Sequence, residues 1–297
     1  MQNIPVLHVT GESLADAYEK ALVVLHEQGT RVKTEYDRPG DPPSLDATMN
    51  ITVLDPLREP MIHKAFPGGI EDLREYAMEL MGVKDDWVRN MNDAADTRWE
   101  YTYHGRLAAY GVWRERKDGR RVRAGPFEID QVERVVAKLA ERPHTRRAQM
   151  ITWMPNLDLD CDDAPCLQSL WYRIVADEAG DEWLNCNVRF RSNDAWGAGF
   201  MNMFGITQFN LQVVADGISK RTGRELKLGR MNWHADSYHI YGKDLREAEQ
   251  RLFDRLASTS FAQRVYHFAD PTIQAIYDEA EAQVRAKLRR YAEQHPS

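Results

Sequence analysis

The chain has 297 residues, of which 43% are hydrophobic and 29% charged, and its formal net charge is −7 at pH 7. This composition is that of a globular protein with a sizeable core, and the acidic balance argues against a nucleic acid polymer as the main ligand. The chain has only three cysteines, which favours a reducing compartment over a disulfide framework. Because these cysteines do not have the spacing of a zinc site, no metal is expected. No apolar run reaches transmembrane length and no secretory leader is recognisable, so we expect a cytoplasmic protein without a membrane partner.

Helices and turn-rich segments are predicted to follow one another in the N-terminal part of the chain. A helix is predicted over 13–27, where Leu14, Tyr18 and Leu22 share one face. Three prolines in 33–50 predict a loop that ends before a strand at 49–54. The pattern then predicts a helix at 70–82, an aromatic mixed segment at 99–113, a charged turn at 114–125 and an amphipathic helix that runs from Ile129 and ends before Pro143.

Strands dominate the middle of the chain. They are predicted at 148–153, 167–176, 184–191, 226–234 and 237–241, and helices at 203–221, 244–256 and 271–294, with Gly223 ending the first of these. In 184–191 the apolar residues alternate with Asn185, Asn187 and Arg189, as a half-buried strand requires. Strands interleaved with long helices predict an α+β fold, in which helices pack on a mixed β-sheet, and we expect one domain over 1–297.

A lone cysteine stands behind a proline where one strand is predicted to begin, in the segment DAPCLQSLWYRI. Pro165 lacks an N–H and is tolerated at the first residue of a strand, which puts the thiol of Cys166 at an edge of the sheet, within reach of a substrate. The structural alternative is that Cys166 is a small buried hydrophobic residue.

Four polar features supply groups that a nucleotide needs. Arg146 and Arg147 precede a strand, and Arg191-Ser192-Asn193-Asp194 ends one; paired guanidinium groups and a hydroxyl suit a phosphate. Asn202 offers a donor and an acceptor for a base edge, and His239 and Tyr241, two residues apart, can bond sugar hydroxyls. Taken singly, each has a simpler structural role, such as a solvated surface, a helix cap for Asn202 or a salt bridge between Arg191 and Asp194.

In order and spacing, these features together resemble the thymidylate synthase superfamily over about 99–245. The family's nucleophile motif is matched by Pro165-Cys166, its base-reading asparagine by Asn202, and its sugar-binding HxY by His239 and Tyr241. Two further segments, Ile129 to Gln131 and Tyr103 to Leu107, also look like the family.

The resemblance implies a sheet-mediated homodimer with shared active sites, in which Arg146 and Arg147 reach the partner's nucleotide phosphate. Arg191 and Ser192 would bind the phosphate of their own site, and Asp194 would face the folate. The cosubstrate would be 5,10-methylenetetrahydrofolate. Cys166, its thiolate favoured by Arg191, would add to C6 of a pyrimidine nucleoside monophosphate.

The resemblance also implies which residues hydrogen-bond the base and which remove the proton from its C5. Asn202 would stabilise charge on the ring. Tyr103 and water near a glutamate would take the proton, with Glu75 preferred over Glu79 as that glutamate.

Departures from the family pattern favour hydroxymethylation of the base over methylation. Leu167 follows the cysteine, as in archaeal members and in the CMP hydroxymethylases of nucleoside antibiotic pathways. Residues 83–98 lack the tryptophan-rich cover of ordinary members, and the last residues are polar, so water would reach the exocyclic methylene. The N-terminal phosphate loop is not recognisable, although Arg31 or Arg38 could replace its arginine.

Several alternatives stay open at this point. The first is ordinary thymidylate synthesis from dUMP, with hydride transfer from the folate. The second is a homologue that binds nucleotides without catalysis, and the third is a cysteine hydrolase using His104 or His239. The residues also leave open cytosine against uracil and ribose against deoxyribose.

Overall fold

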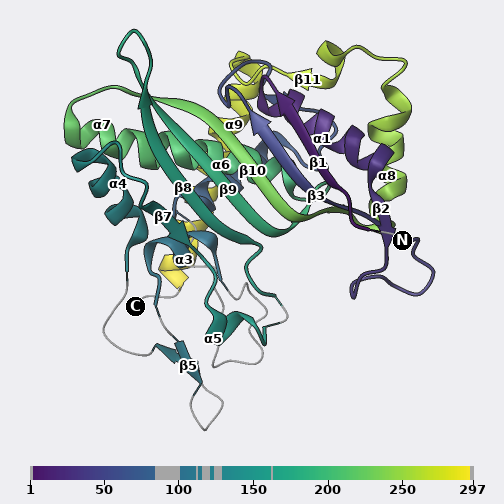
Figure 1. The fold of residues 1–297 in the computed structure, drawn as a ribbon, viewed down its shortest axis with the longest axis horizontal. Coiled ribbons are helices and arrows are strands. Elements are labelled where there is room, and N and C mark those ends of the chain that lie inside the picture. The colour runs from purple at the N-terminus through teal and green to yellow at the C-terminus, as the bar shows by residue number, and fades with distance from the viewer. Residues whose placement is uncertain are drawn as a thin grey trace.

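The computed structural model describes residues 3–83, 101–111, 113–115, 121–123, 129–161 and 163–294. At the centre of this part lies a seven-stranded sheet in the order β1, β3, β10, β9, β8, β7, with β2 paired to β3 (Figure 1). The strands are β1 (Val6–Gly11), β2 (Thr30–Val32), β3 (Ser44–Val53), β7 (Ala148–Ile151), β8 (Leu167–Ala176), β9 (Glu182–Asp194) and β10 (Leu226–Ile240). β1 is parallel to β3 and β9 to β10, whereas the other pairs are antiparallel, so the sheet is mixed as predicted.

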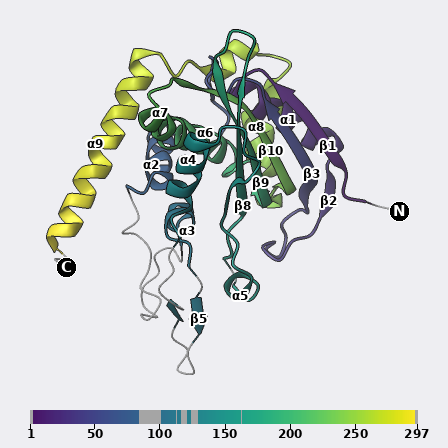
Figure 2. The ribbon, with the colours of Figure 1, turned by 60° about the vertical axis from the view of Figure 1, so that its left-hand side comes forward.

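Helices pack on this sheet, which confirms the α+β class. They are α1 (Leu14–Gln28), α2 (Ile70–Leu80), α3 (Tyr103–Ala108), α4 (Gln131–Glu141), α5 (Pro155–Asp158), α6 (Gly199–Phe209), α7 (Asp216–Thr222), α8 (Leu245–Arg251) and α9 (Pro271–Gln294). Two further sheets have two antiparallel strands each: β4 (Ile62–His63) with β11 (Val265–Tyr266), and β5 (Trp113–Glu115) with β6 (Arg121–Arg123). Figure 2 shows α2, α4, α6 and α7 beside β8 and β9, with α9 as the outermost helix.

The two faces of the sheet differ in chemistry because alternate side chains of a strand point to opposite sides. In β3, Ala47, Met49 and Ile51 are fully buried on the side of α1. Thr48 and Asn50, between them, are half-exposed and hydrogen-bond to β10. The prediction for β9 is confirmed in the same way: its apolar residues are buried and the alternating polar ones are not. One face therefore makes the core, and the other is polar.

Three helical segments follow one another without a break: α6, a π-helical segment, Asn210–Ala215, and α7. The predicted helix at 203–221 is thus four residues short at its start, where Gly199 and the buried Phe200 gave no capping signal. Its predicted end is confirmed, because Gly223 takes the left-handed conformation with φ 68° that only glycine adopts freely.

Two predicted boundaries were wrong. The segment 33–50 is a loop only up to Pro43; strand β3 begins at Ser44, because its apolar residues alternate from Leu45 onward once the prolines have passed. The strands expected at 226–234 and 237–241 are one strand, β10, with an irregular register between Ala235 and Tyr238. Strand β1, which joins the edge of the sheet, was not predicted.

Some predictions lie outside the described residues. Of the segment 83–98, in which the tryptophan-rich cover is missing, only residue 83 is described. Of the charged turn predicted at 114–125, only residues 114, 115 and 121–123 are described. The last three residues of the chain lie outside the described part. In the part of the chain that is described, no helix is both long and apolar enough to cross a membrane.

Candidate active site

Cys166 lies in the short loop immediately before β8, and its side chain is partly exposed. We expected an edge of the sheet, but β8 is an inner strand between β7 and β9, so the thiol stands at the end of a strand rather than on an edge strand. Arg191 of β9 holds this loop: its backbone N–H donates to the Cys166 carbonyl at 2.9 Å, and its Nε donates to the Pro165 carbonyl at 3.1 Å. Cys166 and Arg191 are therefore fixed relative to each other.

The groups around Cys166 have opposite effects on the pKa of its thiol. Burial is the main cause that raises the pKa of the thiol, and nearby Asp163 and Asp194 raise it further. Arg191 lowers it, as the sequence suggested, but does not outweigh burial, so the net pKa is raised. The thiol is thus held mainly protonated at neutral pH until another positive charge or a substrate alters the balance.

Two tyrosines, Tyr101 and Tyr103, lie near this thiol. Burial is the main cause that raises the pKa of Tyr101, and Tyr103 and Cys166 raise it further. The pKa of Tyr103 is raised mainly by burial and then by Cys166. The Tyr103 hydroxyl accepts a hydrogen bond from the Leu167 N–H at 3.2 Å, which ties the phenol to the residue after the cysteine. Because their pKa values are raised, these phenols stay neutral and can both donate and accept hydrogen bonds.

Asn202 reaches the same cluster from the first turn of α6. Its side chain is 6% exposed and does not cap the helix, whose N-terminal residue is preceded by Ala198 without a side-chain cap bond. Instead, the Tyr76 hydroxyl of α2 donates to Asn202 Oδ1. Gly205 makes this possible, because a Cβ there would lie 2.7 Å from the Tyr76 ring and push α2 away from α6.

The two glutamates of α2 differ in burial. Glu79 is 5% exposed, and its charge is one of the causes, after burial and Tyr103, that raise the pKa of Tyr76. Glu75 is half-buried one turn earlier on the same face of the helix. The assignment of the water-organising role to Glu75 stays a prediction.

The RSND motif ends β9 beside β10. Ser192 is paired in register with Ser237, and Asp194 with His239. Asp194 Oδ1 accepts the N–H groups of Trp196 at 3.1 Å and Gly197 at 2.9 Å, so the carboxylate fixes the turn into α6. Burial raises the pKa of Asp194 despite these bonds.

His239 and Tyr241 lie together, as predicted. Their ring centroids are 4.6 Å apart in an edge-to-face arrangement. Burial lowers the pKa of His239, and burial, Asp194 and nearby tyrosine raise that of Tyr241 to about 12. Tyr36, from the loop before β3, contacts Tyr241 with ring centroids 6.0 Å apart.

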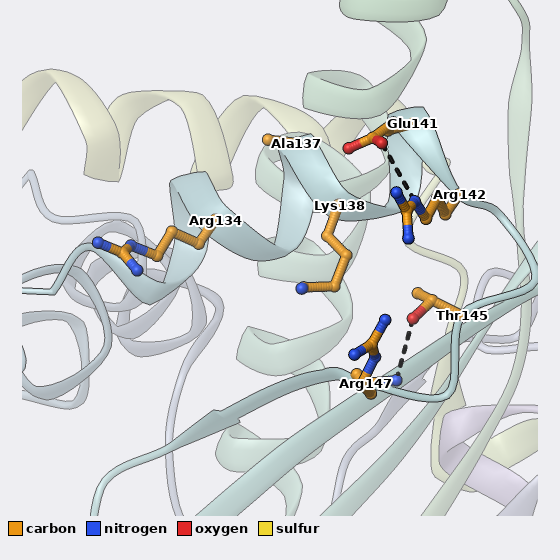
Figure 3. A pocket seen from close by; sticks show the side chains of 7 residues that line it. All are labelled: Arg134, Ala137, Lys138, Glu141, Arg142, Thr145 and Arg147. Atoms are coloured by element: carbon orange, nitrogen blue, oxygen red, sulfur yellow. Dashed lines mark hydrogen bonds and ion pairs between the residues drawn. The ribbon is translucent and has the colours of Figure 1, made fainter.

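The predicted phosphate pair, Arg146 and Arg147, lies elsewhere. Both are exposed just before β7, and within the described residues no hydrogen bond or ion pair links either side chain to the Cys166 cluster. Figure 3 shows Arg147 across from Lys138 of α4 and from Arg142, the residue after this helix, around a surface groove of about 480 Å³. Within one chain, therefore, this arginine pair does not contact Cys166.

Several residues near Cys166 and His239 could not be recognised as site residues from the sequence. Tyr76 and Tyr101 stand in segments without a motif, and Asp46 and Ser237 meet only because β3 and β10 pair. Only their neighbours in space identify them. Among the described side chains, no three histidine, cysteine, aspartate or glutamate residues gather as metal ligands would.

The site thus combines a loop-held thiol, an adjacent arginine, an amide fixed by a tyrosine and a histidine–tyrosine pair. Chemically, such a set offers a nucleophile together with hydrogen-bonding groups for a polar ligand. The family model described as thymidylate synthase matches residues 71–296. The chain belongs to the thymidylate synthase family.

Curated relatives agree with this family. A protein of Methanococcoides burtonii named "Putative thymidylate synthase" is 27% identical over 245 residues, which cover 82% of this chain and 93% of the relative. Proteins with the same name are 33% identical over 132 residues in Methanothermobacter marburgensis, covering 44% of this chain and 53% of the relative, and 26% identical over 236 residues in Methanosarcina barkeri, covering 80% and 90%.

Proposed function

We propose that this protein transfers a one-carbon unit from 5,10-methylenetetrahydrofolate to C5 of a pyrimidine nucleoside 5′-monophosphate, through a covalent bond between Cys166 and C6. The observation that carries the proposal is the fixed position of Cys166 between Arg191, which holds its loop, and Tyr103, whose hydroxyl accepts the N–H of the next residue, Leu167. Tyr76 fixes the base-reading amide of Asn202. Family membership supports one-carbon chemistry at this thiol.

The chemistry begins with the sulfur. The thiolate adds to C6, and the electron pair of the C5–C6 bond moves toward C5 and the ring carbonyl or its nitrogen equivalent. Asn202, held by Tyr76, donates to the ring where this charge gathers. C5 then bonds the folate's methylene carbon while one of that carbon's two bonds to nitrogen breaks. The C5 proton leaves to water held near Glu75, and the Tyr103 hydroxyl hydrogen-bonds that water.

The next step decides the product. Expulsion of tetrahydrofolate leaves an exocyclic methylene at C5. Addition of water to it, followed by departure of Cys166, gives a 5-hydroxymethyl nucleotide with no change in the oxidation state of the folate. The raised pKa values keep Tyr101 and Tyr103 neutral, so each phenol can donate a hydrogen bond to a water molecule, and this favours hydration of the methylene.

The competing product is a methylated base. There the folate donates hydride to the methylene and leaves as dihydrofolate, as the names of the archaeal relatives would suggest. A homologue that binds the nucleotide without catalysis is the third possibility; the loop bonds that fix Cys166 beside Arg191 favour catalysis over it.

A product assay separates these cases. The protein is incubated with methylenetetrahydrofolate and, in turn, CMP, dCMP, UMP and dUMP, and the nucleotides are analysed by mass spectrometry. We expect a 5-hydroxymethyl nucleotide and no rise in dihydrofolate absorbance. Dihydrofolate formed in step with nucleotide consumption would establish methylation instead, and failure of a 5-fluoropyrimidine nucleotide to trap the protein covalently would exclude catalysis through Cys166.

We also propose that the active enzyme is a homodimer built on the polar face of the sheet. Arg146 and Arg147 are exposed and bonded to nothing at their own Cys166, so a site completed by the partner's pair accounts for them. Half-exposed Trp171 and the exposed Val175 of β8 supply apolar area on that face. A second copy of this chain is the occupant we propose.

A further inference from the structure

A hydrogen-bonded chain of three side chains runs from β3 to the sugar-binding pair. Ser237 donates its hydroxyl proton to Asp46 Oδ2 at 2.8 Å, and Ser237 Oγ lies 3.2 Å from His239 Nδ1. Asp46 is 8% exposed and His239 is 5% exposed. None of the motifs of the sequence includes Asp46 or Ser237.

This chain exists because of a bulge in β10. Between Ala235 and Tyr238 the register against β3 shifts, so three steps along β10 match two along β3. Without the extra residue, Ser237 and His239 would point into the core with Ala235, since alternate residues share a face. After the shift, His239 stands directly opposite Asp46, and Tyr238 is the residue that is buried in the core.

The direction of each hydrogen bond follows from counting protons. Ser237 has one hydroxyl proton, which goes to Asp46, so Ser237 Oγ can only accept from His239. His239 Nδ1 therefore carries the ring proton.

The other ring nitrogen is left without a partner. His239 Nε2 is buried and makes no hydrogen bond within the described residues. Burial lowers the pKa of His239, so the ring is neutral and Nε2 presents a bare lone pair. Such a nitrogen is costly to bury unless a donor reaches it.

We propose that Asp46 and Ser237 are positioning residues that hold His239 in the Nδ1–H tautomer, so that Nε2 accepts a hydrogen bond from a hydroxyl group of the nucleotide's sugar. This rests on the proposed function for the identity of the ligand. The tautomer itself is a property of the unliganded protein.

Nitrogen-15 NMR of the histidine rings tests the tautomer directly. The protein offers an internal reference: His63 Nδ1 accepts the Ala65 N–H at 3.1 Å, and its Nε2 faces Glu19 at 2.8 Å, so His63 must be the opposite, Nε2–H tautomer. We expect the His239 signals, assigned with His239→Gln, to report a protonated Nδ1. In Ser237→Ala they should shift toward the Nε2–H form, while those of His63 do not move.

Binding of sugar analogues tests the consequence. Ser237→Ala should weaken binding of the nucleoside monophosphate about fivefold, the worth of one neutral hydrogen bond. The 2′-deoxy or 3′-deoxy analogue that lacks the recognised hydroxyl should bind both proteins equally. Asp46→Asn keeps an oxygen that accepts from Ser237 and should retain the native tautomer and affinity, whereas Asp46→Leu should behave like Ser237→Ala.

An Nε2–H tautomer in the native protein, or His239 signals unchanged in Ser237→Ala, would overturn the proposal. Equal weakening for the nucleotide and for both deoxy analogues would also overturn it, because the loss would then not involve a sugar hydroxyl. Failure of the proposed reaction appears separately, as absence of covalent trapping by a 5-fluoropyrimidine nucleotide while the histidine spectra are as expected.

Discussion

Two polar clusters are buried in this protein, and they differ in how completely their atoms are paired. At β4, His63 uses both ring nitrogens, and Glu19 receives two hydrogen bonds from Arg264, at 2.8 and 2.7 Å, besides the one from His63. At the Cys166 site the thiol is partly exposed and His239 Nε2 has no partner within the described residues.

The difference separates groups that stabilise the fold from groups that can act on a ligand. A buried cluster in which every atom is paired gains stability and has nothing to offer a substrate. A cluster with unpaired atoms costs stability in the empty protein and is repaid when a ligand supplies the missing partners. Substitutions in the two clusters should therefore affect different measurements.

The largest effect is expected at the nucleophile. Cys166→Ala should abolish turnover, by at least roughly 10⁴-fold, because no other group can form the C6 adduct, while nucleotide affinity changes less than about tenfold. Steady-state kinetics and equilibrium binding measure the two quantities. Cys186→Ala is the matched control: Cys186 is buried in the core, so stability should fall and activity per folded molecule should not. Retained turnover in Cys166→Ala would remove the thiol from the mechanism.

The exposed arginines should come next. Arg147→Ala should lower kcat/KM by about 10²-fold through loss of a charge-assisted phosphate contact. Mixing inactive Arg147→Ala and Cys166→Ala proteins should restore roughly a quarter of native activity, because half of the molecules become mixed dimers with one intact site. Absence of recovery, once mass spectrometry has shown subunit exchange, would mean that each chain completes its own site.

In the paired cluster the effect should be on stability. Glu19→Ala leaves His63 and Arg264 buried without their carboxylate and should cost about 3 kcal/mol of unfolding free energy, with activity unchanged in the folded protein. Urea unfolding at pH 7 measures it. Arg58→Ala, which removes an exposed ion pair with Glu12, should cost less than about 1 kcal/mol and serves as the control. Loss of activity at full stability in Glu19→Ala would contradict the division between the clusters.

The same carboxylate should give stability a defined pH dependence. Burial alone would raise the pKa of Glu19, but hydrogen bonds from Arg264 and His63 outweigh it and lower the pKa to about 2. A lowered folded-state pKa contributes stability above the unfolded value, near 4.5, and this contribution is lost as pH falls toward 2. Urea titrations between pH 5 and about 2.5 should show this loss in the native protein and a shallower one in Glu19→Gln.

The smallest effects are expected from two tyrosine–asparagine hydrogen bonds, one near Cys166 and one in the core. Tyr76→Phe removes the donor to Asn202 Oδ1 and should lower kcat/KM about tenfold, with little change in stability. Tyr172→Phe removes an equivalent bond, from the Tyr172 hydroxyl to Asn210 Oδ1 at 2.7 Å, in the core. It should cost about 1 kcal/mol of stability and leave activity intact. The same outcome in both variants would show that Tyr76 has no role in the reaction.

Local patterns along the chain were enough for some of the regular elements, whereas β1 was missed and the start of β3 was misplaced. The limits of β8 and α9 follow directly from alternation and helical spacing, and Gly223 ended its helix as predicted. Such features depend on neighbours in sequence, which any reader of the chain can see. The motif residues Cys166, Arg191, Asn202 and His239 were also identified from order and spacing.

What the sequence by itself determined is the fold class, the family and the identities of the motif residues, because periodicity and motif spacing are properties of one chain segment at a time. What only the tertiary structure decided is which side chains support them. Tyr76 meets Asn202 because Gly205 lets two helices approach closely, and Asp46 meets Ser237 because a bulge in β10 turns His239 out of the core. Both contacts join residues more than a hundred positions apart, and local pattern carries no information about pairing at that distance.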